Sequence, residues 1–283
     1  MNGLVLEGGA MRGMFTAGVL DYLMEQDLVF DGIIGVSAGA CFGANYKSHQ
    51  IGRTLRYNIK YSKDKRYCSM DSLIRTGNIF NARFCFHDVP EELDVFDRAV
   101  YEDDPAKFYV AASDIKSGEP AYKLLNYMDR TDLEWVRASS SMPFFAEIVH
   151  LEGMSLLDGG LTDPIPLRFM KQKGYDKNVV VLTKPLDFRK NKNNLKPLIK
   201  MKYRKYPVLV KLLEKNYAIY NREKDYIEKE LELGNIFLIA PDSPLPLGHI
   251  CHDEDLIQKA YDIGYDKAAQ VFEDLDYYLN GAD

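Results

Sequence analysis

The sequence predicts an α/β protein built in three layers, with a central, mostly parallel β-sheet covered by helices on both faces. Two observations predict this class. Short apolar runs typical of buried strands alternate along the chain with longer segments of helical periodicity, and such alternation produces parallel sheets with helices on each side. The 283 residues, 46% of them hydrophobic, also suffice to bury a large core without stabilising disulfides.

The strand and helix signals are clearest near the N-terminus. They predict a strand at 4–7, a helix at 14–26, a strand at 32–36 and a helix at 38–47. The first of these helices places Phe15, Val19 and Leu23 on roughly one face, as a helix packed on a sheet requires. The next segment, 48–104, is polar, contains several tyrosines and has no clear period. We expect it to hold helices and loops that border the functional site.

The rest of the chain repeats the strand signal and ends in a long helix. The predicted elements are strands at 108–112, 121–125, 154–157, 179–183 and 235–240 and a helix at 254–279. The last strand and helix form a C-terminal extension that follows a basic segment. We expect this extension to pack on the same domain.

Residues 35–39 are the most informative motif. They read Gly35-Val36-Ser37-Ala38-Gly39, a G-x-S-x-G that follows the apolar pair Ile33-Ile34 and precedes a predicted helix. This is the context of a nucleophile elbow, in which a sharp strand-to-helix turn exposes the serine hydroxyl. The flanking glycines let backbone and substrate approach without a Cβ in the way. The motif predicts Ser37 as a nucleophile.

A glycine-rich turn lies between the first predicted strand and the first predicted helix. It reads Gly8-Gly9-Ala10-Met11-Arg12-Gly13. Such a turn presents unpaired backbone amides at the positive end of a helix, so it can hold an oxyanion or a phosphate. One strand-like segment precedes the elbow here, whereas several strands precede the nucleophile of an α/β-hydrolase. An ordinary Ser-Asp-His hydrolase therefore fits this chain poorly.

Three motifs together resemble those of the patatin-like phospholipases. They are Glu7-Gly8-Gly9-Ala10-Met11-Arg12-Gly13, then Gly35-Val36-Ser37-Ala38-Gly39, then Asp158-Gly159-Gly160, in the order that the family shows. The segment Asp132 to Pro143, with Ala138-Ser139-Ser140, also resembles the family's helix ending in A-S-S-x-x-P. The resemblance covers about residues 3–185. It implies a patatin-like catalytic domain at 1–185, followed at 186–283 by the basic segment and the extension.

The resemblance also implies roles for individual residues. Ser37 would be the nucleophile and Asp158 its one side-chain partner. The oxyanion would be bound by the glycine-rich turn, which comprises Gly8, Gly9, Ala10, Met11, Arg12 and Gly13. Gly35, Gly39, Gly159 and Gly160 would support the two catalytic motifs. One position departs from the family pattern, because Ala10 stands where a glycine is usual.

A serine that is activated by an aspartate requires the pKa of that aspartate to be raised. An unperturbed aspartate has a pKa of about 3.9 and accepts a hydroxyl proton poorly at neutral pH. Burial raises a carboxylate pKa, and an acyl chain that expels water from the cleft adds to this effect. Asp158 follows a predicted strand, and in a parallel sheet that strand end is where Ser37 also emerges. We expect a lipid acyl hydrolase, of phospholipase A or lysophospholipase type, that uses an acyl-enzyme and needs no cofactor or metal.

Two alternatives stay open at this point. The first is a patatin-fold protein that has lost activity and acts as a binding protein, since a fold does not establish a function. The second is a nucleotide-binding module that uses the glycine-rich turn on phosphate, although the turn lacks the third glycine and the G-K-S/T of known phosphate loops. A triad role for His249 or His252 is not expected, because their neighbourhood reads as a surface loop.

Composition and charge limit the kinds of partner that we expect. The net charge of −6 argues against a nucleic-acid partner. The segment 184–229 nevertheless carries 14 Lys and Arg against 5 Asp and Glu, with apolar residues at helical spacing. Such a basic amphipathic helix is either a cover packed on the domain or a peripheral membrane contact.

No apolar run approaches the length of a membrane span. The four cysteines lack a disulfide pattern and the first strand leaves no room for a signal peptide, so we expect a cytoplasmic protein.

Overall fold

A computed structural model describes residues 1–192 and 196–281 of the chain. In it an eight-stranded sheet runs in the order β5-β6-β3-β2-β1-β7-β8, and β4 pairs with β3. The strands are β1 (Asn2–Leu6), β2 (Gly32–Val36), β3 (Lys107–Asp114), β4 (Pro120–Leu125), β5 (Val149–Leu151), β6 (Met154–Asp158), β7 (Lys177–Val181) and β8 (Ile236–Ile239).

The sheet has a parallel body and an antiparallel margin. Neighbouring strands of the series β3, β2, β1, β7 and β8 pair in parallel. In contrast, β4 and β6 pair antiparallel with β3, and β5 pairs antiparallel with β6. The predicted mostly parallel sheet is therefore confirmed, whereas β5 was not predicted. A three-residue strand carries too short an alternation of apolar and polar residues to be recognised.

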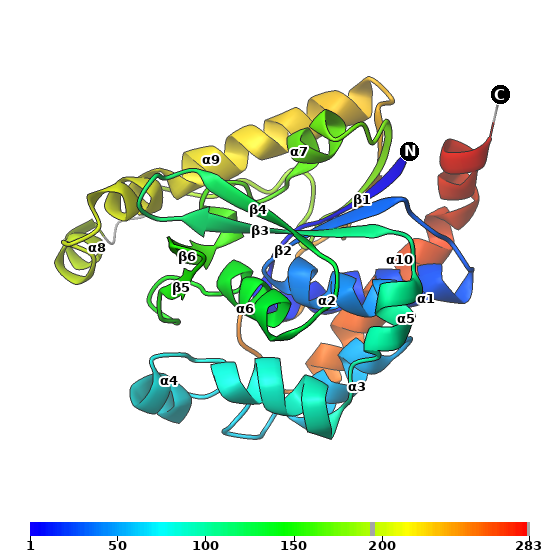
Figure 1. The fold of residues 1–283 in the computed structure, drawn as a ribbon. Helices are drawn as coiled ribbons and strands as arrows, with labels where there is room; N and C mark the ends of the chain where they lie inside the picture. Colours follow the sequence, from blue (N-terminus) through cyan, green and yellow to red (C-terminus); the bar gives the residue numbers. More distant parts are fainter. Residues whose placement is uncertain (193–195, 282–283) are drawn as a thin grey trace.

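Helices cover both faces of this sheet, as predicted (Figure 1). One layer contains α1 (Gly13–Glu25), α2 (Ala38–Lys47), α3 (Arg53–Lys60), α5 (Arg98–Asp103), α6 (Arg130–Ser139) and α10 (Glu254–Asn280). The opposite layer contains α7 (Leu167–Gln172) and α9 (Pro207–Glu232). The remaining helical segments are η1 (Ala10–Arg12), α4 (Met70–Thr76), the π-helix η2 (Phe84–Leu93), η3 (Gly159–Leu161) and α8 (Lys196–Lys202).

The strand sequences explain the two cores that lie on opposite faces of β1 and β2. In β1, Leu4 and Leu6 belong to the larger core beneath α1, α2 and α10, whereas Val5 belongs to the core beneath α7 and α9. In β2, Ile33 and Ile34 divide between the same two cores. Strands buried on both faces are apolar at every position rather than at alternate ones. This is why the central strands read as continuous apolar runs.

The C-terminal helix α10 lies directly on α1. The two helices approach most closely at Gly18 and Gly264, where a Cβ atom would lie 2.0 Å from the Tyr261 carbonyl oxygen and 1.9 Å from the Phe15 carbonyl oxygen. Neither position therefore accepts a side chain without moving a helix. The predicted helix 254–279 matches α10 within one residue. Through this contact, α10 packs on the helix that follows the glycine-rich turn.

Candidate active site

Strands β2 and β6 meet end to end along one edge of β3. β2 pairs with β3 as far as Val36, opposite Ala111, and the last residue of β6, Asp158, pairs with the next β3 residue, Ala112. β4 covers the other edge of β3. The expectation that Asp158 ends a parallel strand is thus wrong, because β6 is antiparallel. It arrives from the opposite direction, so its C-terminal residue still reaches the residue that follows β2, Ser37.

Ser37 occupies a strained turn. Its backbone angles are φ 55° and ψ −121°, a region that non-glycine residues rarely adopt, and it precedes the first residue of α2. The Ser37 amide donates to Ser139 Oγ over 2.9 Å, and Ser139 Oγ donates to the Ala111 carbonyl over 2.6 Å. Ser139 therefore connects the elbow to β3 through two hydrogen bonds. The sequence analysis quoted its A-S-S motif but gave Ser139 no role.

The glycines of the elbow permit close packing. A Cβ atom on Gly35 would lie 2.4 Å from the Gly39 carbonyl oxygen, and one on Gly39 would lie 2.5 Å from the Leu6 carbonyl oxygen. A Cβ atom on Gly8 would lie 2.8 Å from the Ser37 Cβ. The structure thus brings the glycine-rich turn and the elbow into direct contact, as the sequence analysis expected of these motifs.

Asp158 is buried beside Ser37. Burial raises the pKa of Asp158 to about 6, and hydrogen bonds from Ser37 and the Gly160 amide together with the charge of Lys190 offset part of this rise. The Gly160 amide donates to Asp158 Oδ1 over 2.8 Å. Gly159 packs against β3 so closely that a Cβ would lie 2.2 Å from the Ala111 carbonyl oxygen. The geometry therefore gives a carboxylate of increased basicity next to a serine hydroxyl.

The glycine-rich turn offers fewer amides than the sequence analysis expected. The Met11 amide donates to the His249 carbonyl over 3.3 Å, and the Arg12 amide donates to the Gly9 carbonyl over 3.2 Å. Within 1–192 and 196–281, the amides of Gly9 and Ala10 have no hydrogen-bond partner. Ala10 has a φ of 50°, so the one position that departs from the family pattern adopts a conformation that favours glycine. Gly13, the last residue of the turn, opens α1.

The Arg12 side chain contacts a histidine rather than a carboxylate. Its Nη2 lies 2.8 Å from His249 Nε2. The described part of the chain contains no ion pair between Arg12 and an acidic residue. Burial lowers the pKa of Arg12, and burial together with the charges of Arg12, Lys184 and Lys190 lowers the pKa of His249 to about 4. His249 is therefore neutral at physiological pH.

An apolar cavity of about 150 Å³ begins at Ser37. Its walls come from the glycine-rich turn, α2, α3, η2 and α6, and most of its lining is apolar. Cys41, one helical turn beyond Ser37, lines it and lies with Sγ 3.2 Å from Ser140 Oγ. Other lining residues are Met11, Phe42, Tyr57, Tyr67, Ile79, Phe80, Phe86, Val89, Leu133, Val136, Met142 and Phe145. The segment 48–104 thus borders the site, as predicted.

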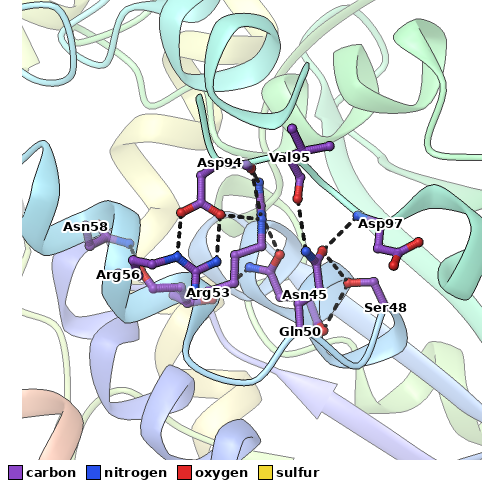
Figure 2. A network of polar contacts seen from close by, with 10 residues as sticks. Asn45, Ser48, Gln50, Arg53, Arg56, Asn58, Asp94, Val95 and Asp97 are labelled. Carbon is purple, nitrogen blue, oxygen red and sulfur yellow. Dashed lines mark hydrogen bonds and ion pairs between the residues drawn. The ribbon is translucent and has the colours of Figure 1, made fainter. Parts of the chain in front are cut away.

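A polar network joins α3 to the segment after η2 (Figure 2), and its members Arg53 and Asn45 line the cavity. Arg53 donates from Nη1 to Asn45 Oδ1 over 2.6 Å and from Nη2 to the Asp94 carbonyl over 2.5 Å. Arg56 forms two 2.8 Å bonds to the Asp94 carboxylate, while Gln50 accepts from the Asp97 amide over 3.0 Å. The network satisfies its buried polar groups, so it reads as a structural wall.

The five histidines of the chain all bond to groups other than Ser37. Their partners are Asp104 for His49, Glu134 for His87, Ser155 for His150, Arg12 for His249 and the Ser62 carbonyl for His252. The structure places the Asp158 carboxylate within hydrogen-bond reach of the Ser37 side chain.

Comparison with known proteins identifies the family. The profile of the patatin-like phospholipases matches residues 4–171, more than half of the chain. The chain belongs to the patatin-like phospholipase family. It is thus a lipid ester hydrolase by family, and the nucleotide-binding alternative loses its support. A second profile, a domain of unknown function (DUF6363), matches residues 206–280.

Individual relatives agree with this assignment. The chain is 30% identical over 249 residues to the uncharacterized protein YjjU of Escherichia coli (strain K12), covering 86% of this chain and 69% of YjjU. It is 31% identical over 185 residues to the lysophospholipase nte1 of Aspergillus fumigatus, covering 62% of this chain and 11% of that protein. The chain therefore spans about a tenth of the fungal enzyme.

A solved structure is also similar. VipD from Legionella pneumophila aligns with a TM-score of 0.47 and 14% sequence identity, over 96% of this chain and 67% of that chain. Within the described residues, no helix of this patatin-like protein is both long and apolar enough to cross a bilayer.

Proposed function

We propose that this protein hydrolyses an acyl ester of a lipid through a Ser37–Asp158 dyad, in the manner of a phospholipase A or lysophospholipase. The observation that carries the proposal is the placement of a strained serine beside a buried carboxylate in the wall of an apolar cavity. The family profile and the fungal relative named as a lysophospholipase support the substrate class.

The proposed reaction proceeds through an acyl-enzyme. Asp158 accepts the Ser37 proton as Ser37 Oγ attacks the ester carbonyl, and the collapse of the tetrahedral intermediate expels the alcohol, which takes up that proton. A water then gives its proton to Asp158 and attacks the acyl group, which releases the fatty acid and returns the proton to Ser37. The amides of Gly9 and Ala10 stabilise the oxyanion, the kind of contribution whose loss typically costs about 10²- to 10³-fold in rate.

The cavity defines where the acyl chain goes. Because the lining is mostly apolar and begins at Ser37, an acyl chain that fills it expels water from the carboxylate. The pKa of Asp158 then rises further, and the carboxylate becomes a stronger base. A lipid ester thus gains an advantage over a short polar ester that leaves the cavity wet.

Peripheral membrane contact belongs to this proposal, but through a smaller surface than the whole segment 184–229. The apolar stripe of α9 faces inward, since Leu209, Leu213 and Tyr220 are buried. In α8 the apolar side chains of Leu198 and Met201 are exposed beside Lys200 and Lys202. We assign the contact to α8, which presents apolar and basic groups together.

A fluorophosphonate probe tests the dyad. The wild type should be labelled at Ser37, while Ser37→Ala should lose labelling and almost all hydrolysis of a medium-chain ester. Ser117→Ala is the matched control, because Ser117 lies in the turn between β3 and β4 and bonds to Asp114. A wild-type protein that binds lipid but is neither labelled nor active would instead be the catalytically silent binding protein. A Ser37→Ala variant that keeps a tenth of the activity would refute the dyad.

A further inference from the structure

Two lysines gather over one aromatic ring next to the proposed site. The Nζ atoms of Lys184 and Lys190 lie 4.5 Å and 4.4 Å from the centre of the Tyr220 ring. Both lysines follow β7, in a stretch that precedes α8, while Tyr220 belongs to α9. The ring attracts each ammonium group. It does not neutralise either charge.

The carboxylates nearby do not pair with these cations. Among the residues that the structure describes, neither Lys184 nor Lys190 forms an ion pair, and Glu7 is already engaged. Glu7 accepts from the Thr183 amide over 2.6 Å, from Thr183 Oγ1 over 3.0 Å and from the Tyr220 hydroxyl over 2.7 Å. The neighbourhood thus holds more positive than negative charge.

The loop that carries Lys190 is held firmly. Asn221 of α9 bonds both backbone groups of Lys190, accepting from its amide over 2.8 Å and donating to its carbonyl over 3.1 Å. Arg189 forms ion pairs with Asp225 at 2.9 Å and Glu228 at 2.6 Å. The position of Lys190 is therefore set by its contacts with α9.

A chain of hydrogen bonds connects Lys190 to the dyad. Lys190 Nζ donates to Asn216 Oδ1 over 3.0 Å, Asn216 Nδ2 donates to the Gly160 carbonyl over 2.8 Å, and the Gly160 amide donates to Asp158. A surface cavity of about 300 Å³ lies against Lys190 and Asn216. Lys190 thus borders open space within a few hydrogen bonds of the reacting groups, and Lys184 contacts the same Tyr220 ring as Lys190.

The order of the strands shows on which side of Ser37 the two lysines lie. Ser37 follows β2 and Lys184 lies three residues after β7, with β1 between the two strands. Neighbouring strands are about 4.8 Å apart, so these strand ends are separated by roughly 10 Å. The acyl cavity extends from Ser37 toward α3 and η2. An ester bound at Ser37 would have its tail in that cavity and its alcohol part free to reach the lysines.

Burying an ammonium group without an anionic partner costs free energy, and a bound anion would offset this cost. Burial and the charge of Lys184 lower the pKa of Lys190 to about 8, and burial lowers the pKa of Lys184. An anion would restore the charged forms and gain charge-assisted hydrogen bonds from both. Phosphate suits this pair better than a carboxylate does, because it offers more acceptor oxygens to two separate ammonium groups.

We propose that Lys184 and Lys190, positioned by α9, form a subsite for the phosphate group of the substrate's headgroup. This inference rests on the proposed function and specifies its substrate class. The enzyme should prefer phosphate-bearing lipid esters to neutral esters with the same acyl chain.

The test compares two matched soluble substrates, 1-hexanoylglycerol 3-phosphate and 1-hexanoylglycerol. Kinetics at pH 7 keep Asp158 mostly ionised and leave Lys190 mostly charged in the wild type. Lys184→Met and Lys190→Met should each lower kcat/KM for the phosphate ester about 10- to 100-fold, mainly through KM, as loss of a charge-assisted hydrogen bond does. Hydrolysis of the neutral ester should change less than threefold. Lys215→Met, at an exposed lysine of α9, is the matched control.

Each other outcome overturns the subsite. Equal losses on both esters would make the lysines structural, and unchanged activity on the phosphate ester would leave them without a role. Inhibition by inorganic phosphate without preference for the phosphate ester would mean a site for the free anion. If the Met variants fail to fold, Lys190→Gln replaces them, since it removes the charge but keeps a donor for Asn216. Absence of Ser37-dependent hydrolysis of either ester would refute the proposed function itself, which separates the two failures.

Discussion

Replacing Asp158 by asparagine should destroy activity and stabilise the fold at the same time. Asparagine keeps the shape of the side chain and an oxygen that can accept from the Gly160 amide, but it cannot take a proton from Ser37. Loss of a general base typically lowers the rate about 10²- to 10⁴-fold. Ester hydrolysis should therefore fall by at least 10²-fold.

The gain in stability follows from the buried charge. The pKa of Asp158 rises from 3.8 to about 6 on folding, which corresponds to about 3 kcal/mol at roughly 1.36 kcal/mol per pKa unit. Because the folded-state pKa is the higher one, this contribution is fully present below pH 3.8 and is lost as the pH rises through about 6. The wild type is thus less stable at pH 8 than at pH 4 by up to that amount, as far as Asp158 contributes. The asparagine variant escapes the loss.

The assay is thermal unfolding at pH 8 and pH 4, together with ester hydrolysis. Asp158→Asn should unfold about 5 °C above the wild type at pH 8 and close to it at pH 4. Asp163→Asn is the matched control, because burial also raises the pKa of Asp163 to about 6 but its carboxylate accepts from Tyr122. It should gain similar stability and keep its activity. An Asp158→Asn variant no more stable than the wild type at pH 8 would refute the reasoning on buried charge.

Four further outcomes are expected. The wild-type kcat/KM should rise with pH through about 6 as Asp158 ionises, and a profile flat from pH 5 to 8 would contradict its role as the base. Ala10→Gly should raise the free energy of unfolding by about 1 kcal/mol, because it relieves a φ of 50°, and denaturant titration checks this. Arg53→Met should destabilise the fold by about 1 to 3 kcal/mol, since it leaves Asn45 Oδ1 and the Asp94 carbonyl without their donor while Arg56 still pairs with the Asp94 carboxylate, and the same titration measures it. Replacing Lys200, Lys202, Arg204 and Lys205 by glutamate should weaken sedimentation with anionic vesicles at low salt, because each basic residue contributes about 1 kcal/mol to vesicle binding. Hydrolysis of a soluble ester should not change. Wild-type vesicle binding that does not depend on salt would contradict this prediction.

Much of the fold was predictable because its signals are local. The strand 32–36 and the helix 38–47 match β2 and α2 at both ends, since an apolar run, a G-x-S-x-G and a helical period meet within sixteen residues. The strand predicted at 179–183 lies two residues too late, because Leu182 and the β-branched Thr183 extend the strand signal, whereas Thr183 bonds to Glu7 outside the sheet. The direction of β6 was not predictable, because strand pairing depends on contacts far apart in the sequence.

The sequence shows the motifs of the proposed site, but it does not show the contacts that hold these motifs in place. Ser37 and Asp158 stand in motifs with characteristic spacing, and the structure brings them together. The amides of Met11 and Arg12 are occupied by the His249 and Gly9 carbonyls, a competition that no local pattern reveals. The role of Ser139 depends on a contact with an elbow about a hundred residues away.

The C-terminal part of the chain shows most clearly why function cannot be assigned from the catalytic motifs alone. A boundary at residue 185 stays a prediction, and it places both motifs before the basic segment. Yet Asn216 of α9 donates to the Gly160 carbonyl, and Tyr220 donates to Glu7 at the end of β1. These contacts fix the backbone on either side of the dyad from the region that the second profile matches. If Lys184 and Lys190 form the proposed phosphate subsite, part of the basic charge of the segment 184–229 serves substrate binding and not only the proposed membrane contact.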